Sequence, residues 1–476
     1  MPKPARNVVY IHSHDTGRYV APYGHALHTP HYQRFAEQGV LFRNAFCANP
    51  TCSPSRACLL TGRYAHANGM FGLAHRGGKL DDPSQCLPHY LREHGFRTAL
   101  AGIQHIHAGD MAHCGYTDDL HQGQEKLQLP DDPDFDKRDG ESVCRAELFL
   151  QKQSDDTPPF FLDVGFFLTH RTGPEPDPDR PDGPTIAWHN DDASPLGDPR
   201  YAAAPPCLPD TPEVRRDYAD YAHAVMRLDK HVGRVLDAID QAGLADDTLV
   251  IITTDHGIAF PGMKCRLTKH GTGVLLLMRG PSATNEPGFL GGRVIQGLAS
   301  HVDVFPTVCE ALGLDAPDWL QGTSLTPLLE QDDDTGSVRE HVFSEVNYHG
   351  SREPMRSVRT SRYNYVRHLE PLPHAARPNI DNSISKTQLH EAGLLDRAVR
   401  SEQLFDLYAD PQEACNVADD PAYADTLKEL RAALDTWMRD TGDPAIHGKI
   451  HRPNMRLNRA EDYSPTDATT YIETQP

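Results

Sequence analysis

Apolar runs alternate with segments of helical periodicity through most of the chain. Short runs rich in apolar and β-branched residues predict buried strands at 7–13, 97–101, 160–166 and 248–254. Segments with helical spacing, each followed directly by a glycine, predict helices at 30–38, 55–61, 87–94 and 212–242. Alternation of this kind predicts an α/β fold with a large, mainly parallel sheet sandwiched by helices.

A polar, acidic segment at 331–336 separates this pattern from a different one. Beyond it, 355–367 and 403–408 predict antiparallel strands, and 423–439 predicts a helix. We therefore expect a large α/β domain over 1–335, a small C-terminal α+β subdomain with an antiparallel sheet over 336–445, and a polar tail over 446–476. The segment 172–212 is rich in proline and aspartate and predicts a long loop.

The charge of the chain limits its partners. A formal net charge of −21 argues against nucleic acid, because nothing would offset phosphate repulsion. A small anionic substrate is compatible with it, since a metal ion and a few basic residues make one site locally positive. No apolar run has the length of a membrane span, and the first residues lack the pattern of a secretory signal. We expect no membrane partner and a cytoplasmic location.

Two predicted strands end in pairs of aspartate and histidine. His14-Asp15 follows the strand at 7–13, and Asp255-His256 follows the strand at 248–254. Sites in open α/β sheets form where parallel strands end, so the two pairs are expected to meet. Carboxylate oxygen and imidazole nitrogen both bind divalent cations. The sequence therefore predicts one metal site made by these pairs.

Between the pairs lies the string Cys52-Ser53-Pro54-Ser55-Arg56, with Thr61-Gly62-Arg63 after it. On composition alone, Cys52 would be a buried thiol at a helix start. The whole string resembles the sulfatase motif. Four further segments resemble type I sulfatases of the alkaline phosphatase superfamily, namely Asn7–Gly17, 29–46, Thr248–Gly257 and Leu404–Ala418. Within that family the chain looks closest to N-sulfoglucosamine sulfohydrolases and their bacterial relatives, on the basis of Cys52–Leu73, Gly257–Pro261 and Pro354–Val358.

The resemblance implies an alkaline phosphatase-like fold and a metal-dependent hydrolase of sulfate esters or sulfamates, with 1–335 as the catalytic domain. It implies that a formylglycine-generating enzyme oxidises Cys52 to formylglycine (3-oxoalanine), whose hydrated gem-diol attacks sulfur. An unmodified thiol cannot follow this route. One divalent cation, Ca²⁺ by family or Mn²⁺ as the imidazole-tolerant alternative, would be held by His14, Asp15, Cys52, Asp255 and His256.

The resemblance also assigns four residues to the reaction. Arg56 would hold the gem-diol and anchor the carboxylates on the metal side. His105 would accept a proton as the aldehyde re-forms, and His170 would protonate the leaving group. Lys264 would contact the sulfate oxygens. A single histidine at a strand end is more often structural, so these assignments depend on the matched positions.

The chain departs from the family pattern at three positions. His14 and His256 stand where aspartate and asparagine are common, which leaves His14 open as a direct ligand or as a residue behind the ligands. Ile103 replaces a sulfate-binding lysine, and two readings stay open: Lys264, Lys269 or His270 replaces the lost cation, or the substrate differs. The substrate pocket is expected to include Trp188, His189, Tyr348, His349 and Arg352.

Three functions stay open at this point. The first is a sulfatase acting on a sulfated sugar or on an aryl or alkyl sulfate. The second is a phosphonate monoester or phosphodiester hydrolase with side activity on sulfates, because an Asp-His metal pair also resembles those enzymes. The third is a non-catalytic member that binds an anion or a protein. A homo-oligomer is compatible with the sequence, which does not specify one.

Overall fold

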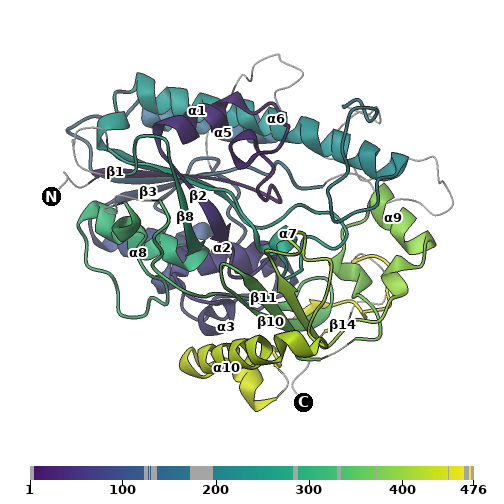
Figure 1. Ribbon diagram of the computed structural model, residues 1–476. Coiled ribbons are helices and arrows are strands. Elements are labelled where there is room, and N and C mark those ends of the chain that lie inside the picture. The colour runs from purple at the N-terminus through teal and green to yellow at the C-terminus, as the bar shows by residue number, and fades with distance from the viewer. Residues whose placement is uncertain are drawn as a thin grey trace.

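The fold is organised around an eight-stranded sheet, shown with its helices in the computed structural model of Figure 1. The structure describes residues 5–122, 127, 129, 137–171, 197–281, 288–329, 334–370, 372–448, 450–465 and 471–472. The strands of this sheet are β1 (Asn7–Ser13), β2 (Val40–Phe46), β3 (Arg97–Gly102), β4 (Asp118–Asp119), β5 (Phe160–Gly165), β6 (Thr248–Thr254), β7 (Leu276–Arg279) and β8 (Arg293–Ser300). Within the described residues their order is β4-β3-β5-β1-β6-β7-β2-β8.

The sheet is mixed, with parallel pairs in the majority. Strand β7 runs antiparallel to both of its neighbours, β6 and β2, and the other neighbouring pairs are parallel. Parallel neighbours need a long crossover, usually through a helix. The connection from β6 to β7 runs over 255–275 and contains the short helix α7 (Lys269–Thr272), and β7 returns antiparallel to β6. The expected mainly parallel sheet is thus confirmed, with one reversed strand.

Alternate residues of β1 face two separate hydrophobic cores. Val9 and Ile11 belong to the core formed with helices α1 (Pro30–Gln38), α5 (Lys137–Leu150) and α6 (Pro212–Gln241). Val8 and Tyr10 belong to the core formed with α2 (Cys52–Thr61), α4 (Leu87–Glu93) and α8 (Val304–Leu312). Figure 1 shows α1, α5 and α6 above the sheet and α2 and α8 below it. Burial on both faces explains why this strand is apolar nearly throughout.

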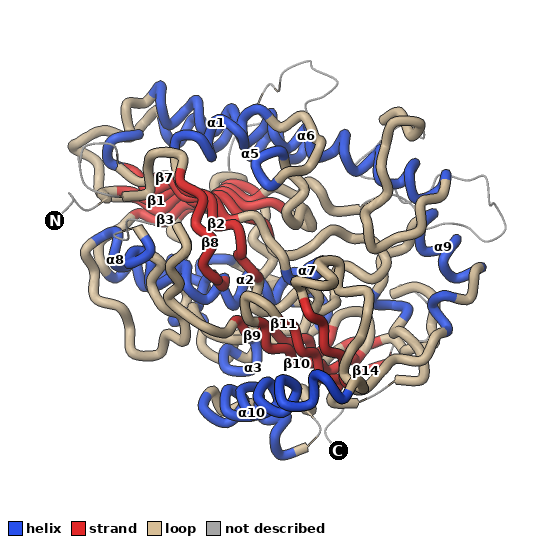
Figure 2. Tube along the Cα trace, viewed as in Figure 1, coloured by secondary structure: helices blue, strands red, loops and turns tan. Residues whose placement is uncertain are grey.

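A smaller antiparallel sheet lies beside the large one (Figure 2). Its order is β12-β11-β10-β9, and its strands are β9 (Val342–Tyr348), β10 (Arg352–Arg359), β11 (Tyr363–His368) and β12 (Glu402–Asp406). Helix α10 (Ala424–Asp440) packs on this sheet. The structure also contains α3 (Ala65–Asn68), α9 (Ile384–Glu391) and the antiparallel strand pair β13 (Arg456–Leu457) and β14 (Tyr471–Ile472). The domain limits at 335 and 445 remain predictions.

Four predicted features differ from the structure or lie outside it. The strand expected over 355–367 is two strands, because Thr360 donates its backbone N–H to Tyr363 and closes a hairpin turn. Helix α2 begins at Cys52, three residues early, since proline is tolerated in the first turn of a helix. Residues 172–196 of the expected loop lie outside the described residues. Met455 and Leu457 of the expected polar tail are buried. In the described part of the chain, no helix combines the length and apolar character that crossing a bilayer requires.

The strand order places four chain segments at one edge of the large sheet. Strands β3, β5, β1 and β6 are consecutive neighbours and run parallel, so their carboxyl ends share that edge. The segments that leave these ends carry His105, His170, His14-Asp15 and Asp255-His256. This is the general position of sites in open α/β sheets.

Candidate active site

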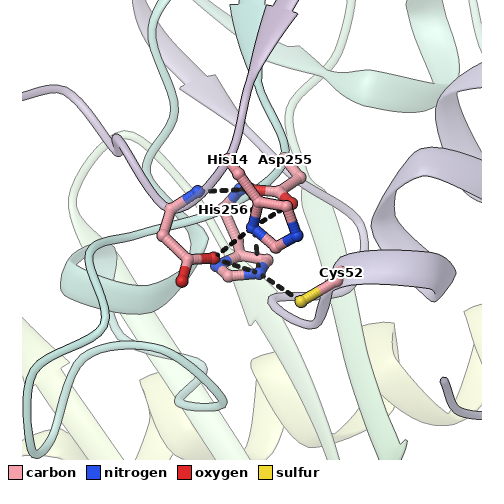
Figure 3. Close-up of side chains that lie close together, drawn as sticks. His14, Cys52, Asp255 and His256 are labelled. Atoms are coloured by element: carbon pink, nitrogen blue, oxygen red, sulfur yellow. Dashed lines mark hydrogen bonds and ion pairs between the residues drawn. The ribbon is translucent and has the colours of Figure 1, made fainter. Parts of the chain in front are cut away.

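The five residues predicted as metal ligands meet in one buried cluster. Each offers one donor atom, and these atoms lie within 4.8 Å of one another in the set His14, Asp15, Cys52, Asp255 and His256. None of the five residues is more than 3% exposed. Figure 3 shows His14, Asp255 and His256 turned toward one another, with Cys52 reaching them from the start of a helix. Two carboxylates and two imidazoles form a donor set that fits a divalent cation.

Backbone geometry holds the two carboxylates together. Asp15 has a φ of 56°, a left-handed conformation that residues other than glycine rarely adopt. In this turn the backbone N–H of Asp15 donates to Asp255 Oδ1 at 2.8 Å. The Nδ1 atom of His14 lies 2.7 Å from Asp15 Oδ1 and 3.2 Å from Asp255 Oδ2. His256 Nε2 lies 3.2 Å from Asp15 Oδ1, so both imidazoles face the carboxylates.

The pKa shifts favour charged carboxylates and a neutral imidazole. Burial raises the pKa of Asp15, but Lys264 and His256 outweigh it and lower the pKa to about 2. Burial also raises the pKa of Asp255, and the neighbouring cationic groups again outweigh it and lower the pKa. Burial lowers the pKa of His14 well below its usual range. A neutral imidazole beside two carboxylates leaves a nitrogen lone pair for a cation.

Cys52 is the first residue of α2 and is 2% exposed. Its Sγ lies 3.4 Å from His256 Nε2. Burial raises the pKa of the thiol well above its usual value, and the opposing effect of Lys264 is smaller. A protonated thiol is a weak nucleophile, so as encoded Cys52 is poorly suited to attack an ester.

Arg56 lies one turn after Cys52 on α2 and is 1% exposed. Its Nη2 donates to Asp255 Oδ2 at 3.0 Å and to the backbone oxygen of Ser13 at 3.1 Å. Its Nη1 donates to Nδ1 of His12. This one guanidinium therefore joins the helix that carries Cys52 to the ends of β1 and β6.

The sequence did not predict a buried network of polar side chains that contacts Arg56. His12 Nε2 lies 2.8 Å from Asp163 Oδ1, and Asp163 Oδ2 accepts from Gln104 Nε2 at 2.6 Å and Tyr116 Oη at 2.5 Å. These hydrogen bonds fix the tautomer and orientation of His12, which in turn positions Arg56. A signal was present in the sequence, because His12 and Asp163 interrupt two apolar strands.

Lys264 joins the cluster to the C-terminal part of the chain. Its Nζ donates to Asp15 Oδ2 at 3.0 Å and lies 3.1 Å from Asp381 Oδ2. Lys264 is 3% exposed, and the two carboxylates outweigh burial and raise its pKa. Asp381 was not anticipated, because its segment has no pattern that points to a site. This lysine therefore brings one positive charge to the cluster, shared between two carboxylates.

Two further predicted histidines border the cluster. The ring of His170 meets that of His14 edge-on at 4.5 Å between centroids, and His170 Nδ1 lies 2.5 Å from the backbone oxygen of Arg171. The ring of His105 lies 6.2 Å from that of His14. His105 Nε2 is bonded to Nδ1 of His75 at 3.0 Å, a contact that the sequence did not suggest.

The structure corrects the predicted replacement for the cation lost at Ile103. Lys269 and His270 point away from the cluster, where the Lys269 backbone N–H donates to Glu413 and His270 Nε2 lies 2.9 Å from the backbone oxygen of Gln412. Both residues are on α7 and line a separate pocket that contains no member of the cluster. Ile103 itself lines a cavity of about 400 Å³ together with His105. Of the three candidates, Lys264 alone reaches the cluster.

The residues predicted to line the substrate pocket lie in different parts of the structure. Trp188 and His189 lie outside the described residues. Tyr348 is on β9 and donates to the backbone oxygen of Ile450 at 2.9 Å, while Arg352 is on β10 and pairs with Glu370 at 2.9 Å. Both were expected in loops and instead make structural contacts. His349 is buried, and burial and then Lys264 lower its pKa well below the usual range, so it lies near the site.

Comparisons with known proteins agree with this geometry. The family model described as Sulfatase matches residues 6–314. An N-sulphoglucosamine sulphohydrolase of Homo sapiens is 31% identical over 485 residues, which cover 93% of this chain and 91% of the relative.

Two solved structures share the fold. One protein in complex with its substrate D-glucosamine-2-N,6-O-disulfate has a TM-score of 0.67 and 20% identity, covering 94% of this chain and 100% of that chain. A phosphonate monoester hydrolase of Agrobacterium radiobacter has a TM-score of 0.66 and 20% identity, covering 92% and 96%. The buried cluster, the match over most of the large sheet and the 31% identical relative lead to one conclusion. The chain belongs to the sulfatase family, whose members hydrolyse sulfate esters or sulfamates.

Proposed function

We propose that the enzyme hydrolyses its substrate through a formylglycine made from Cys52 and with one bound divalent cation. The observation that carries the proposal is the single buried cluster that joins Cys52 to both Asp/His pairs. The raised pKa of the Cys52 thiol adds support, because an unmodified thiol would be mostly protonated at this position. When formed, formylglycine supplies a hydrated aldehyde whose hydroxyl attacks sulfur.

The cation would be held by Asp15, Asp255, His256 and the modified residue 52, with His14 as a further nitrogen donor. Bound there, it would lower the pKa of the attacking hydroxyl and offset charge on the sulfate oxygens. Oxygen ligands favour Ca²⁺, and two imidazoles favour a softer ion such as Mn²⁺. We propose Ca²⁺ as the family ion, with Mn²⁺ as its competitor.

The remaining groups would orient charge and protons. Arg56 holds the Asp255 carboxylate in place through its bond at 3.0 Å. Lys264 offers its ammonium group to the sulfate oxygens next to Asp15. His170 engages Nδ1 with a backbone oxygen, which leaves Nε2 to transfer a proton to the leaving group. His105 would accept a proton when the aldehyde re-forms.

A sulfated sugar is the substrate class that we propose. The human relative acts, by its name, on N-sulphoglucosamine, and one protein of the same fold was solved with a disulfated glucosamine. The cavity of about 400 Å³ beside Ile103 and His105 offers room for a sugar ring. Maturation by a formylglycine-generating enzyme belongs to the same proposal. The cytoplasmic location stays a prediction of the sequence.

A phosphonate or phosphodiester hydrolase is the second candidate. The observation that favours it is His256, whose Nε2 lies 3.4 Å from Cys52 Sγ, together with the cation lost at Ile103. A site with fewer cations and more nitrogen ligands differs from the common sulfatase arrangement. One fold can host several chemistries, so the same nucleophile could act on phosphorus in place of sulfur.

Two measurements test the proposal. Mass spectrometry of the Cys52 peptide, from protein produced with a formylglycine-generating enzyme, should show the aldehyde, and an intact thiol would remove the mechanism. Rates on 4-nitrophenyl sulfate, N-sulfoglucosamine and a phenyl phosphonate ester should then rank a sulfur substrate first. A large preference for the phosphonate would favour the second candidate. Cys52→Ala is the matched control, in which hydrolysis should be lost.

A further inference from the structure

A second pocket lies apart from the catalytic cluster, between β2, α7 and the short helical turn Ala21–Tyr23 (β2 and α7 are labelled in Figure 1). Its volume is about 240 Å³, and no member of the catalytic cluster lines it. The charged side chains that line it are Arg18, Arg43 and Lys269. No aspartate or glutamate is among its described lining residues.

The pocket exists because β2 and β7 separate soon after they meet. The two strands pair at Val40 and Leu41 of β2, and the next antiparallel bridge between these segments is at Phe46 and Gly273. Beyond that point Tyr23 inserts its hydroxyl, which accepts from the Leu276 backbone N–H and donates to the Phe42 backbone oxygen, each at 2.8 Å. These bonds replace part of the missing strand ladder, and the space beside them stays open.

Arg18 is fixed in the same gap by neutral partners. Its Nη2 donates to the backbone oxygen of Ala45 at 2.5 Å, and its Nε donates to that of Val274 at 3.4 Å. Its guanidinium also lies 4.5 Å from the centroid of the Phe46 ring. None of these contacts neutralises the charge, so a cation is anchored at the pocket without a counter-ion.

The other two cations likewise have no carboxylate partner for their side chains among the described residues. The guanidinium of Arg43 lies over the ring of Tyr23 at 5.8 Å. Glu413 is close enough to raise the pKa of Arg18 and of Lys269, but its carboxylate accepts from the Lys269 backbone N–H and pairs with Arg359 at 2.5 Å. Arg18, Arg43 and Lys269 are half-buried, and a concave site with one sign of charge concentrates the opposite ion. In a chain of net charge −21 this positive pocket is a local exception.

The electrostatic cost is visible in the pKa values. Burial, aided by Arg359 and Arg43 and opposed by Tyr23 and Glu413, lowers the pKa of Arg18 to about 10. Burial lowers the pKa of Lys269, Glu413 opposes the shift, and Arg18 adds to it. A bound anion would relieve both the burial and the mutual repulsion.

A neutral donor completes the pocket. The side-chain Oε1 of Gln412 is buried and makes no hydrogen bond in the described residues. Amide oxygen and nitrogen are assigned from their partners, so rotation of this amide would present an N–H₂ group to an anion. We propose that the pocket binds a small oxyanion of the sulfate or phosphate class, held by Arg18, Arg43 and Lys269 with Gln412 as a neutral donor. Its volume is below the usual range for larger organic ligands, about 300–1,000 Å³.

The experiment has to separate this site from the catalytic one, which also binds sulfate if the proposed function holds. Crystals of the wild-type enzyme soaked in selenate, a sulfate analogue, would be measured at the selenium edge. We expect an anomalous peak between Arg18, Arg43 and Lys269, whatever is seen at Cys52. A peak confined to the Cys52 cluster, or none at all, would overturn the proposal. This outcome is independent of whether the enzyme prefers sulfur or phosphorus.

A paired variant tests the same point in solution. Sulfate and phosphate would be titrated calorimetrically into Arg43→Gln/Lys269→Gln and into Lys152→Gln/Lys428→Gln, a control that removes two exposed cations. The pocket variant should lose one binding site relative to the control. Without anion it should melt at the same or a higher temperature, because repulsion has been removed, and this also shows that it folds. Equal stoichiometry in the two variants would contradict the proposal.

Discussion

Replacing Arg56 by methionine tests whether this arginine holds the catalytic cluster together. The side chain is 1% exposed, and its Nη2 lies 3.0 Å from Asp255 Oδ2. Removing one partner of a buried ion pair costs about 3–5 kcal/mol, because the other charge is left buried. Asp255 keeps backbone N–H bonds from Asp15 at 2.8 Å and His256 at 2.9 Å. We therefore expect the lower end, about 3 kcal/mol, which is about a hundredfold in the folding equilibrium constant.

An exposed arginine supplies the matched control. Arg431 contacts the carboxylate of Glu402 through Nε and Nη2, but its side chain is 44% exposed. Surface pairs of this kind contribute about 0–1 kcal/mol. Urea titration followed by tryptophan fluorescence gives the free energy of unfolding of Arg56→Met and Arg431→Met. Equal losses in the two variants would refute the reasoning. If Arg56→Met lost hydrolysis but kept its free energy of unfolding, Arg56 would act on the substrate and would not be needed to hold the cluster together.

Three further predictions follow from the same contacts. Lys264→Met should lower kcat/KM on 4-nitrophenyl sulfate by at least about a hundredfold, because the two carboxylates that Lys264 bridges lose their shared cation. A kcat/KM within tenfold of the wild type would contradict a role of Lys264 in hydrolysis. Lys264→Arg, which keeps the positive charge, is the control. Removal of divalent ions by a chelator should abolish hydrolysis, and Ca²⁺ should restore more of it than Mn²⁺; full activity after dialysis against chelator would exclude a metal role. Burial raises the pKa of Glu345, but His66 and Arg356 outweigh it and lower the pKa to about 2. This carboxylate stabilises the fold above its unfolded pKa and loses that effect as pH falls toward 2, so Glu345→Gln should flatten the loss of unfolding free energy in acid; identical acid profiles would argue against it.

Local pattern was sufficient for much of the large sheet. Strands β1 and β6 and helix α1 have the predicted bounds, because each is a run of one periodicity closed by polar residues or glycine. The reversal of β7 was not predictable in the same way. The 255–275 connection is long enough for a crossover, so its length does not set the direction of β7, and four residues of strand carry little signal.

The residues of the candidate site likewise fall into those that the sequence predicted and those that it did not. Residues that follow the ends of β1, β3, β5 and β6 were found from the sequence, because parallel strands bring their carboxyl ends to one edge. Lys269 was one of three alternatives for the cation lost at Ile103, and only the structure shows that it lines a separate pocket while Lys264 reaches Asp15. His75 and Asp381 were missed, because His75 lies in the three-residue helical turn Ala74–Arg76 and Asp381 in an irregular segment, and neither has a periodic pattern.

By itself the sequence determined the α/β order, the Asp/His pairs and the Cys52 motif, all of which depend on local periodicity or on neighbouring residues. Only the tertiary structure decided that Asp381 shares Lys264 with Asp15 and that Arg18, Arg43 and Lys269 surround a separate pocket. Those contacts join segments far apart in the chain. Their geometry comes from how elements pack and where strands separate, and neither property leaves a repeating pattern in the residues.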